Sequence, residues 1–348
     1  MAKLNPGKIR EVFDEVVELE PSERAAQLEE ACGGDADLRS EVEQLLQAHA
    51  DAGDFIERPA MASFYRADEQ TTRELTLEMA GQRIGQYRIL RELGRGGMGV
   101  VYLAERADGE FRKQVAIKLI ASTANEQVKQ RFRRERQILA DLAHPNIARL
   151  LDGGTVNGQP FVVMEFVPGQ SLRELLRERG ALPIEEINTI VQQVCAGLAE
   201  AHEPGIVHRD IKPENLIVAE RHSQLHITIL DFGIAKLQQS PNTTSQTQNA
   251  LILGTPSYMS PEQAAGAGLA EIDKRADIYS LGMVIYEMLT GKPAFQGDSF
   301  MTVLYQHQHV RPTPPHETKS GMMISPAVSA VVMKALAKEP AERQQTAK

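Results

Sequence analysis

Two short motifs constrain this chain more than any other feature of its sequence. The first reads H-R-D-I-K-P-E-N over residues 208–215, and the second, D-F-G over residues 231–233, begins 21 residues after Asp210. If each of the five fixed positions in H-R-D-x-K-x-x-N matches at about 5%, a chance match at a given start has odds of about one in three million. The pattern therefore indicates a functional constellation, and the fold is expected to bring its polar side chains together.

A glycine-rich stretch lies upstream, between two predicted strands. Residues 87–93 alternate as a strand does, residues 94–99 read G-R-G-G-M-G, and residues 100–104 form a second strand. Glycines let backbone N–H groups approach phosphate oxygens closely, because no Cβ intervenes. The pattern G-x-G-x-x-G is weak by itself. Because a strand follows it here, and not the helix of a dinucleotide-binding unit, the sequence excludes a Rossmann site.

Two charged residues follow on the next elements. Lys118 closes the alternating run Val115–Lys118, which puts its ammonium at a strand end. Glu135 lies 17 residues later, in a helix predicted over 128–142. Taken singly, each has an ordinary interpretation, as a solvated edge lysine and as a surface carboxylate.

Taken together and in this order, the motifs resemble the eukaryotic-type (Hanks-type) protein kinases, in the serine/threonine group found in bacteria. The resemblance covers about residues 84–348, roughly three quarters of the chain. It implies an α+β fold with a small β-rich lobe over about 84–166 and a large helical lobe over about 167–348. The sequence ends soon after Arg343, where the family normally continues with a last helix, so the large lobe is expected to be cut short.

The resemblance also implies a catalytic role for four residues. Phosphoryl transfer passes through a loose, highly charged transition state, so catalysis is mostly positioning and charge neutralisation. Lys118 would hold the α- and β-phosphates of ATP, kept in place by an ion pair with Glu135. Asp210 would orient the substrate hydroxyl and take its proton, with Lys212 near the transferred phosphate.

The implied cofactors are ATP and magnesium, with manganese as an alternative metal. Asn215 and Asp231 would carry the metal, since a hard cation prefers oxygen ligands. The family's ATP-binding positions correspond here to Leu93, Gly94, Gly96, Gly97, Gly99, Val101, Ala116, Lys118, the gatekeeper Met164, the hinge residues Glu165 and Val167, and Ile217. The structural positions correspond to His208, Arg209, Phe232, Gly233, Thr255, Asp277 and the ion pair of Glu262 with Arg343.

The substrate class follows from the region around the second motif. Lys212, and Gly254-Thr255 ahead of Ser260-Pro261-Glu262, are typical of Ser/Thr kinases. The 32 residues from Asp231 to Glu262 favour a protein substrate over a small molecule. A pseudokinase or nucleotide-binding signalling scaffold is the alternative, and the complete catalytic set argues against it.

The same region suggests regulation. Residues 236–251 are polar and carry four candidate acceptors, and Arg209 marks kinases whose activation segment is pinned by a phosphate. We hypothesise autophosphorylation at Thr247, with Thr244, Thr243 and Ser245 as alternatives. A plain solvated loop is the other interpretation.

Charge sets the N-terminal region apart. The chain carries a net charge of −9, and residues 1–60 hold 6 basic and 15 acidic side chains, so the remainder is neutral. Apolar stripes at helical spacing predict an acidic all-α domain over 1–52, followed by a linker over 53–83. This head could dock on the basic helix that bears Glu135, in the same molecule or in a homodimer through the head or the small lobe. A merely solvated helix face is equally compatible. The negative charge disfavours nucleic acid as a partner.

Composition also bears on location. The two cysteines, Cys32 and Cys195, are 163 positions apart, which fits a reducing cytoplasm. No membrane segment is predicted, because the most apolar run, Ile278–Leu289, contains Ser280 and Glu287 and suits a buried core helix. The sequence does not decide whether an anchor follows residue 348.

Overall fold

The computed structural model describes residues 12, 27–28, 31–32, 38–39, 79–96, 99–109, 112–120, 141–156, 158–221, 224–232, 256–268, 271–297, 299–318 and 324–348. The chain divides into two compact units, Met1–Glu78 and Met79–Lys348. The described residues of the first unit are helical, and they include the buried side chains of Val12, Leu28, Cys32 and Leu38. Most of the predicted head and linker lies outside the described residues.

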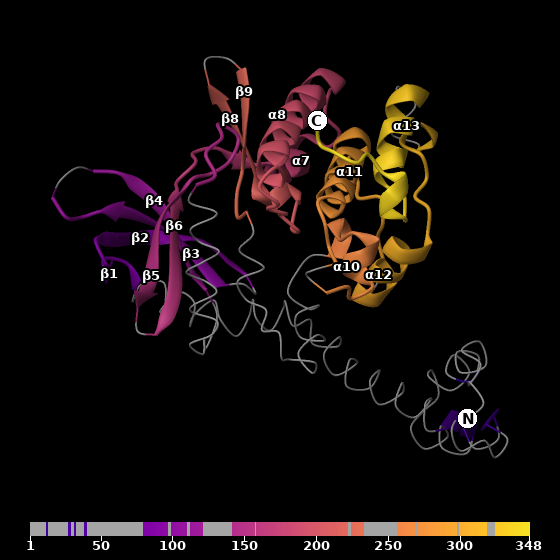
Figure 1. The fold of residues 1–348 in the computed structure, drawn as a ribbon, viewed down its shortest axis with the longest axis horizontal. Helices are drawn as coiled ribbons and strands as arrows, with labels where there is room; N and C mark the ends of the chain where they lie inside the picture. Colours follow the sequence, from indigo (N-terminus) through magenta and orange to yellow (C-terminus); the bar gives the residue numbers. More distant parts are fainter. Residues whose placement is uncertain are drawn as a thin grey trace. The chain divides into compact units, whose positions relative to one another are not determined.

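The second unit begins slightly before the predicted start at residue 84. The Gly81 N–H donates to Ile89 O at 2.9 Å, and Met79 packs against the apolar side chains of the sheet. This unit has the predicted two lobes, a β-rich small lobe and a helical large lobe (Figure 1).

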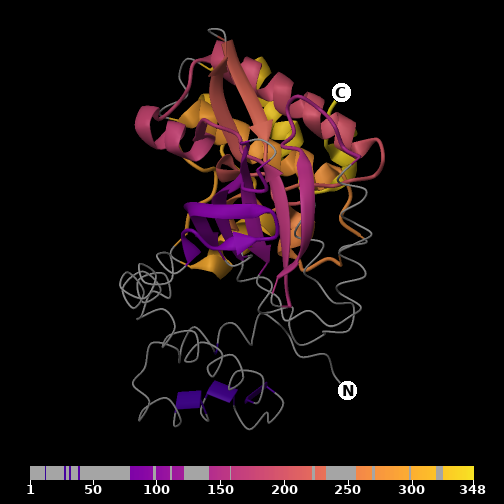
Figure 2. The same cartoon turned by 90° about the vertical axis from the view of Figure 1, so that its left-hand side faces the viewer.

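The small lobe is a six-stranded antiparallel sheet in the order β1-β2-β3-β4-β6-β5, which Figure 2 turns toward the viewer. The period-2 alternation of β4 gives the sheet two different faces. Ile117 joins an apolar cluster on one face, while Ala116 and Ile120 join Met164 in a second cluster on the other. The strands are β1 (Arg83–Ile84), β2 (Tyr87–Gly96), β3 (Gly99–Arg106), β4 (Gln114–Ile120), β5 (Leu150–Val156) and β6 (Gln159–Glu165).

Lys118 corrects the sequence prediction in one respect. β4 continues through Leu119 and Ile120, and Lys118 pairs with Val101 of β3 and Val162 of β6. The ammonium therefore stands on an inner strand and not at a strand end, and only 5% of the residue is exposed. The interpretation as a solvated edge lysine is wrong, because the alternation that located the strand continues past the lysine.

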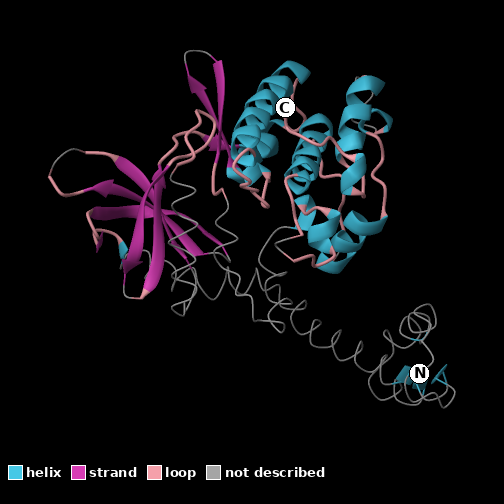
Figure 3. Cartoon of the chain, viewed as in Figure 1, coloured by secondary structure: helices cyan, strands magenta, loops and turns pink. Residues whose placement is uncertain are grey.

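The large lobe packs its helices around one apolar core. In Figure 3 these helices lie to the right of the small-lobe sheet. A second, three-stranded sheet in the order β7-β8-β9 belongs to this lobe. Its strands are β7 (Gln170–Ser171), β8 (Leu216–Arg221) and β9 (Gln224–Ile229). The helices are α7 (Leu172–Arg179), α8 (Ile184–His202), α10 (Pro261–Ala264), α11 (Arg275–Thr290), α12 (Phe300–His309) and α13 (Pro326–Ala335), with 3-10 turns η1 (Pro213–Asn215), η3 (Pro256–Tyr258), η4 (Pro315–Glu317) and η5 (Pro340–Glu342).

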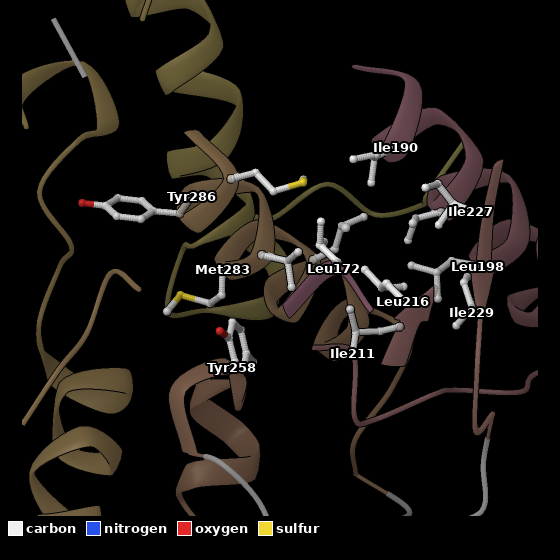
Figure 4. Close-up of a cluster of buried hydrophobic side chains, with 14 of the residues drawn as sticks. Leu172, Ile190, Leu198, Ile211, Leu216, Ile227, Ile229, Tyr258, Met283 and Tyr286 are labelled. Atoms are coloured by element: carbon white, nitrogen blue, oxygen red, sulfur yellow. The ribbon is translucent and has the colours of Figure 1, made fainter. Parts of the chain in front are cut away.

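The apolar core of the large lobe includes a residue of the H-R-D-I-K-P-E-N segment and its neighbour Leu216. Ile211 and Leu216, which flank η1, point into the same cluster as Leu198 of α8 and Met283 of α11 (Figure 4). The apolar run Ile278–Leu289 lies within α11 and is mostly buried, as the sequence predicts. Among the described residues, no helix combines the length and the apolar character needed to cross a membrane.

Candidate active site

The loop that carries His208, Arg209 and Asp210 is anchored from below by Asp277. This carboxylate lies in the first turn of α11 and is fully buried. Its Oδ2 accepts the His208 N–H at 2.9 Å, and its Oδ1 accepts the Arg209 N–H at 2.7 Å. His202, in the last turn of α8, places its Nε2 2.7 Å from Oδ2. One buried carboxylate thus fixes the backbone immediately before Asp210.

The backbone is strained at two points of the site. Within the described part of the chain, Arg209 (φ 67°) and Asp231 (φ 60°) are the non-glycine residues with positive φ. This left-handed region is costly for residues with a Cβ and persists where surrounding contacts hold it. Arg209 belongs to the H-R-D motif and Asp231 to the D-F-G motif.

Asp210 is held by two side chains of its own loop. Asn215 donates from Nδ2 to Asp210 O at 2.7 Å and to Asp210 Oδ2 at 3.1 Å. Lys212 places its Nζ 2.8 Å from the same Oδ2. The carboxylate keeps 29% of its side-chain surface exposed, so it is oriented but remains accessible.

The register of the β8–β9 hairpin brings the second motif to the first. Leu216 pairs with Ile229, so the residue before β8 and the residues after β9 lie side by side. The Leu230 N–H accordingly donates to Asn215 O at 2.8 Å. Asp231 is therefore delivered next to Asn215, although the two residues are 16 positions apart.

An ion pair joins the lobes. Lys118 Nζ of β4 lies 2.7 Å from Asp231 Oδ2. The lysine side chain is only 6% exposed, and the aspartate side chain is 23% exposed. A buried ammonium needs an anionic partner, and this one comes from the other lobe.

Phe232, the residue after Asp231, packs against His208. Its ring meets the His208 ring edge-to-face with centroids 4.7 Å apart, and both residues are buried. His208 Nε2 lies 2.8 Å from Leu230 O. The two motifs therefore pack as one unit.

The expected adenine-binding side chains fall into two groups. Ala116 and Met164 are buried in the sheet cluster that Val101 packs against. Ile217 lies on β8 of the large lobe and packs closely against Gly169. A Cβ added at this glycine would come within 2.8 Å of Ile217 Cγ2. Of the other expected nucleotide-binding positions, Leu93 and Gly94 are exposed, Gly99 has a φ of 128°, Glu165 ends β6, and Val167 lies two residues after it.

The chemistry of the donors fits the implied magnesium. Asn215 donates from Nδ2 to Asp210, so its amide oxygen is the atom that would bind a metal. Asp231 adds a partly exposed carboxylate nearby. Carboxylate and amide oxygens are the ligands that magnesium takes, usually in small numbers together with substrate phosphates. Among the described residues, no cluster of three or more His, Cys, Asp or Glu could form an all-protein metal cage.

Arg343 and Glu262 form an ion pair at the base of the large lobe. The guanidinium donates from Nη1 to Oε1 at 2.9 Å and from Nη2 to Oε2 at 2.8 Å. The arginine side chain is completely buried. The pair fixes α10, which carries Gln263, and Gln263 Nε2 donates to Arg209 O at 2.7 Å.

Several expected positions lie outside the described residues. They are Glu135, Gly97, Gly233, Thr255 and the four candidate phosphorylation sites Thr243, Thr244, Ser245 and Thr247. Gly96 ends β2.

Sequence reasoning missed a second polar cluster, which lies beside the loop of residues 208–215, named the catalytic loop below after its proposed role. Arg173 of α7 contacts Glu214 of η1, Tyr258 of η3 and Glu287 of α11. One signal could have found it. Glu287 stands in the most apolar run of the chain, and a buried carboxylate requires a partner.

This fold and site define a class: two-lobed phosphotransferases with a lysine on the small-lobe sheet and acidic and amide groups on the loops of the large lobe. Comparison with known proteins agrees. Residues 87–348 match the family model described as protein kinase domain. The serine/threonine-protein kinase PknB of Mycobacterium leprae is 41% identical over 261 residues, covering 73% of this chain and 40% of that protein. The serine/threonine-protein kinase pkn2 of Myxococcus xanthus is 37% identical over 265 residues, covering 76% and 31%.

A solved structure extends the comparison. The PknI kinase domain of Mycobacterium tuberculosis is similar with a TM-score of 0.57 and 29% identity, over 77% of this chain and 94% of that domain. The chain belongs to the protein kinase family, in its bacterial serine/threonine branch. It spans about 40% of the length of the PknB relatives it matches.

Proposed function

We propose that this chain transfers the γ-phosphoryl group of ATP to serine or threonine hydroxyls of proteins. The observation that carries the proposal is the 2.7 Å contact between Lys118 and Asp231, which joins the two lobes at the catalytic loop. The buried ammonium can neutralise phosphate charge, and the oxygens of Asp231, Asn215 and Asp210 can bind a divalent cation or a hydroxyl group. Together these groups fit a nucleotide triphosphate with its cation.

Each side chain has a distinct task in this mechanism. Lys118 neutralises charge on the α- and β-phosphates, and Asp210 accepts the proton of the attacking hydroxyl. The hydroxyl oxygen bonds to the γ-phosphorus while the bond from that phosphorus to the β–γ bridging oxygen breaks, and ADP leaves. Lys212, 2.8 Å from Asp210, stabilises negative charge at the transferred group.

Asn215 and Asp231 would hold magnesium. When bound there, the ion would neutralise negative charge on the phosphates. Asp277 would keep Asp210 in place through the backbone N–H groups of His208 and Arg209. Glu135 is proposed to pair with Lys118 when the small-lobe helix predicted to carry it is in position.

A phosphorylation assay tests the proposal. The purified chain is incubated with Mg-ATP and casein, and transfer is measured for the wild type, Asp210→Asn and Glu220→Gln. Asp210→Asn should lower the rate by at least about 100-fold, because it removes the proton acceptor. Glu220 is exposed on β8, so its variant makes the same acid-to-amide change and should behave as wild type.

Three outcomes would count against the proposal or correct it. A wild type that binds nucleotide but transfers nothing would favour the pseudokinase or scaffold alternative. Full activity in Asp210→Asn would overturn the assignment of the base. Phosphate on tyrosine instead of serine or threonine would correct the substrate class.

Regulation and partners remain predictions. We propose autophosphorylation at Thr247, or at Thr243, Thr244 or Ser245, which peptide mass analysis of residues 240–255 from the same assay would detect.

The cytoplasmic location is supported by the cysteine usage, and the homodimer by the opposite charges of the acidic head and the predicted basic helix. The kinase domain is proposed to span 84–348, after the helical head and linker.

A further inference from the structure

Arg173 connects three elements of the large lobe through one guanidinium. It is the second residue of α7. Its Nε donates to Glu214 Oε1 at 2.8 Å, its Nη1 donates to Glu287 Oε1 at 2.7 Å, and its Nη2 donates to the Tyr258 hydroxyl. The three acceptors come from η1, α11 and η3, so the planar fork of the arginine is used on all sides.

The cluster is largely shielded from water. The side chain of Glu287 is 4% exposed and that of Arg173 is 16% exposed. Tyr258 is buried, with its ring in the same apolar core as Met283 (Figure 4). Removing the guanidinium would leave a buried carboxylate without a cation, which is strongly unfavourable.

The protonation of Tyr258 completes the network. Burial, followed by the nearby charge of Glu287, raises the pKa of the Tyr258 hydroxyl well above its usual range. The hydroxyl therefore stays protonated and donates to Glu287 Oε2 at 2.5 Å. Both oxygens of Glu287 are thus engaged, one by Arg173 and one by Tyr258.

Two of the three elements are connected to the backbone around Asp210. Glu214 lies in the catalytic loop, directly before Asn215. η3 leads into α10, whose Gln263 donates to Arg209 O at 2.7 Å, next to Asp210. A polypeptide that presents a hydroxyl to Asp210 would have to lie against these two segments.

We infer that Arg173 is a positioning residue for the polypeptide substrate. It sets the spacing between the catalytic loop, through Glu214, and the segment Pro256–Tyr258, through the tyrosine hydroxyl. None of its direct hydrogen-bond partners is Lys118, Asn215 or Asp231, the residues assigned to the nucleotide and its metal, so the larger effect is expected on the protein substrate. The inference rests on the proposed kinase activity.

Steady-state kinetics of the full chain test it with the variants Arg173→Lys and Tyr258→Phe. Lysine keeps the charge, but one ammonium cannot serve three acceptors in the geometry of the fork. kcat/KM for the protein substrate should fall by about tenfold or more in Arg173→Lys, while KM for ATP stays within about twofold. Tyr258→Phe keeps the buried ring and should shift the same parameter less.

Arg179→Lys is the matched control. Arg179 lies on the same helix and pairs bidentately with Glu186, with 43% of its side chain exposed. This variant should leave both KM values unchanged. If Arg173→Lys raised KM for ATP as much as KM for protein, or matched the wild type throughout, the inference would be wrong.

Hydrogen exchange separates this inference from the proposed function, because it needs no activity. Arg173→Lys should speed amide exchange in both residues 212–216 and 256–259, and Tyr258→Phe in 256–259 alone. Unchanged exchange in both segments would overturn the positioning role even in an active kinase. A wild type without transfer would refute the proposed function, while the exchange result would still decide whether Arg173 ties the two segments together.

Discussion

The two lobes differ in where their buried charged side chains find a partner of opposite charge. Among the described residues, the small lobe buries one charged side chain, Lys118, and its partner Asp231 belongs to the large lobe. The large lobe buries Asp277, Glu287 and Arg343, and each has its partner within the same lobe. Because a buried charge is costly without a counter-charge, the described buried charges stabilise the large lobe from within, whereas Lys118 depends on a residue of the other lobe.

This difference separates the contacts that hold the large lobe together from the contact that joins the lobes. The large lobe holds its catalytic loop with internal contacts, such as those from Asp277 to the His208 and Arg209 N–H groups. Among the described residues, the counter-charge of the small-lobe lysine is Asp231, across the lobe boundary, and the phosphates of a nucleotide would provide another. The comparison therefore predicts that the buried charges paired within the large lobe determine stability and that the Lys118–Asp231 pair between the lobes determines activity.

The largest effect on stability is expected at Arg343. All five of its donor sites are used, on both oxygens of Glu262 and on the carbonyls of Arg275, Ala337 and Lys338. Arg343→Met should lower the free energy of unfolding by about 3–5 kcal/mol, because it strands a carboxylate and three carbonyls. Urea denaturation followed by circular dichroism measures the change.

Arg179→Met provides the control for this measurement. Its pair with Glu186 is exposed, so the free energy of unfolding should change by less than about 1 kcal/mol. If the two variants were equally stable, the internal pairing of the large lobe would not be what stabilises it.

A smaller effect is expected from acid. His307 is fully buried, with its Nδ1 3.0 Å from the Tyr279 hydroxyl, and burial, together with the charge of Lys338, lowers its pKa to about 3. Between its ordinary pKa of about 6.5 and pH 3, the unfolded chain takes up a proton that the folded chain does not. The stability that this histidine contributes is therefore present above about pH 6.5 and is lost as the pH falls.

The pH dependence of unfolding isolates this contribution. Between about pH 7.5 and pH 5, the histidine should account for about 2 kcal/mol of lost stability. His307→Gln cannot titrate, so its loss over the same interval should be smaller by that amount. Parallel losses in both proteins would mean that His307 is protonated in the folded state.

Local patterns predicted much of the fold and of the site. The alternation of β2 and β3 around the glycines, the apolar run of α11 and the two catalytic motifs all lie within short stretches of sequence. These stretches located Lys118, Asp210, Asn215 and Asp231, which the fold then brings together. The strand end at Lys118 was wrong because Leu119 and Ile120 extend β4 beyond the run that was recognised.

The Arg173 cluster could not be predicted in the same way. Its three contacts span 41, 85 and 114 positions, so no periodicity connects them. Only the tertiary packing of α7, η3 and α11 creates the site. The buried Glu287 indicates that some partner is needed, but the sequence does not show which one.

A double-mutant cycle on phosphoryl transfer tests the central claim most directly, namely that Lys118 and Asp231 act as one unit across the lobes. Transfer rates are compared for the wild type, Lys118→Met, Asp231→Asn and the double variant. Each single change should cost about 100-fold or more, and the double variant should be hardly slower than the worse single variant, because both remove the same constellation. Losses that multiply in the double variant, as from two independent sites, would contradict the account.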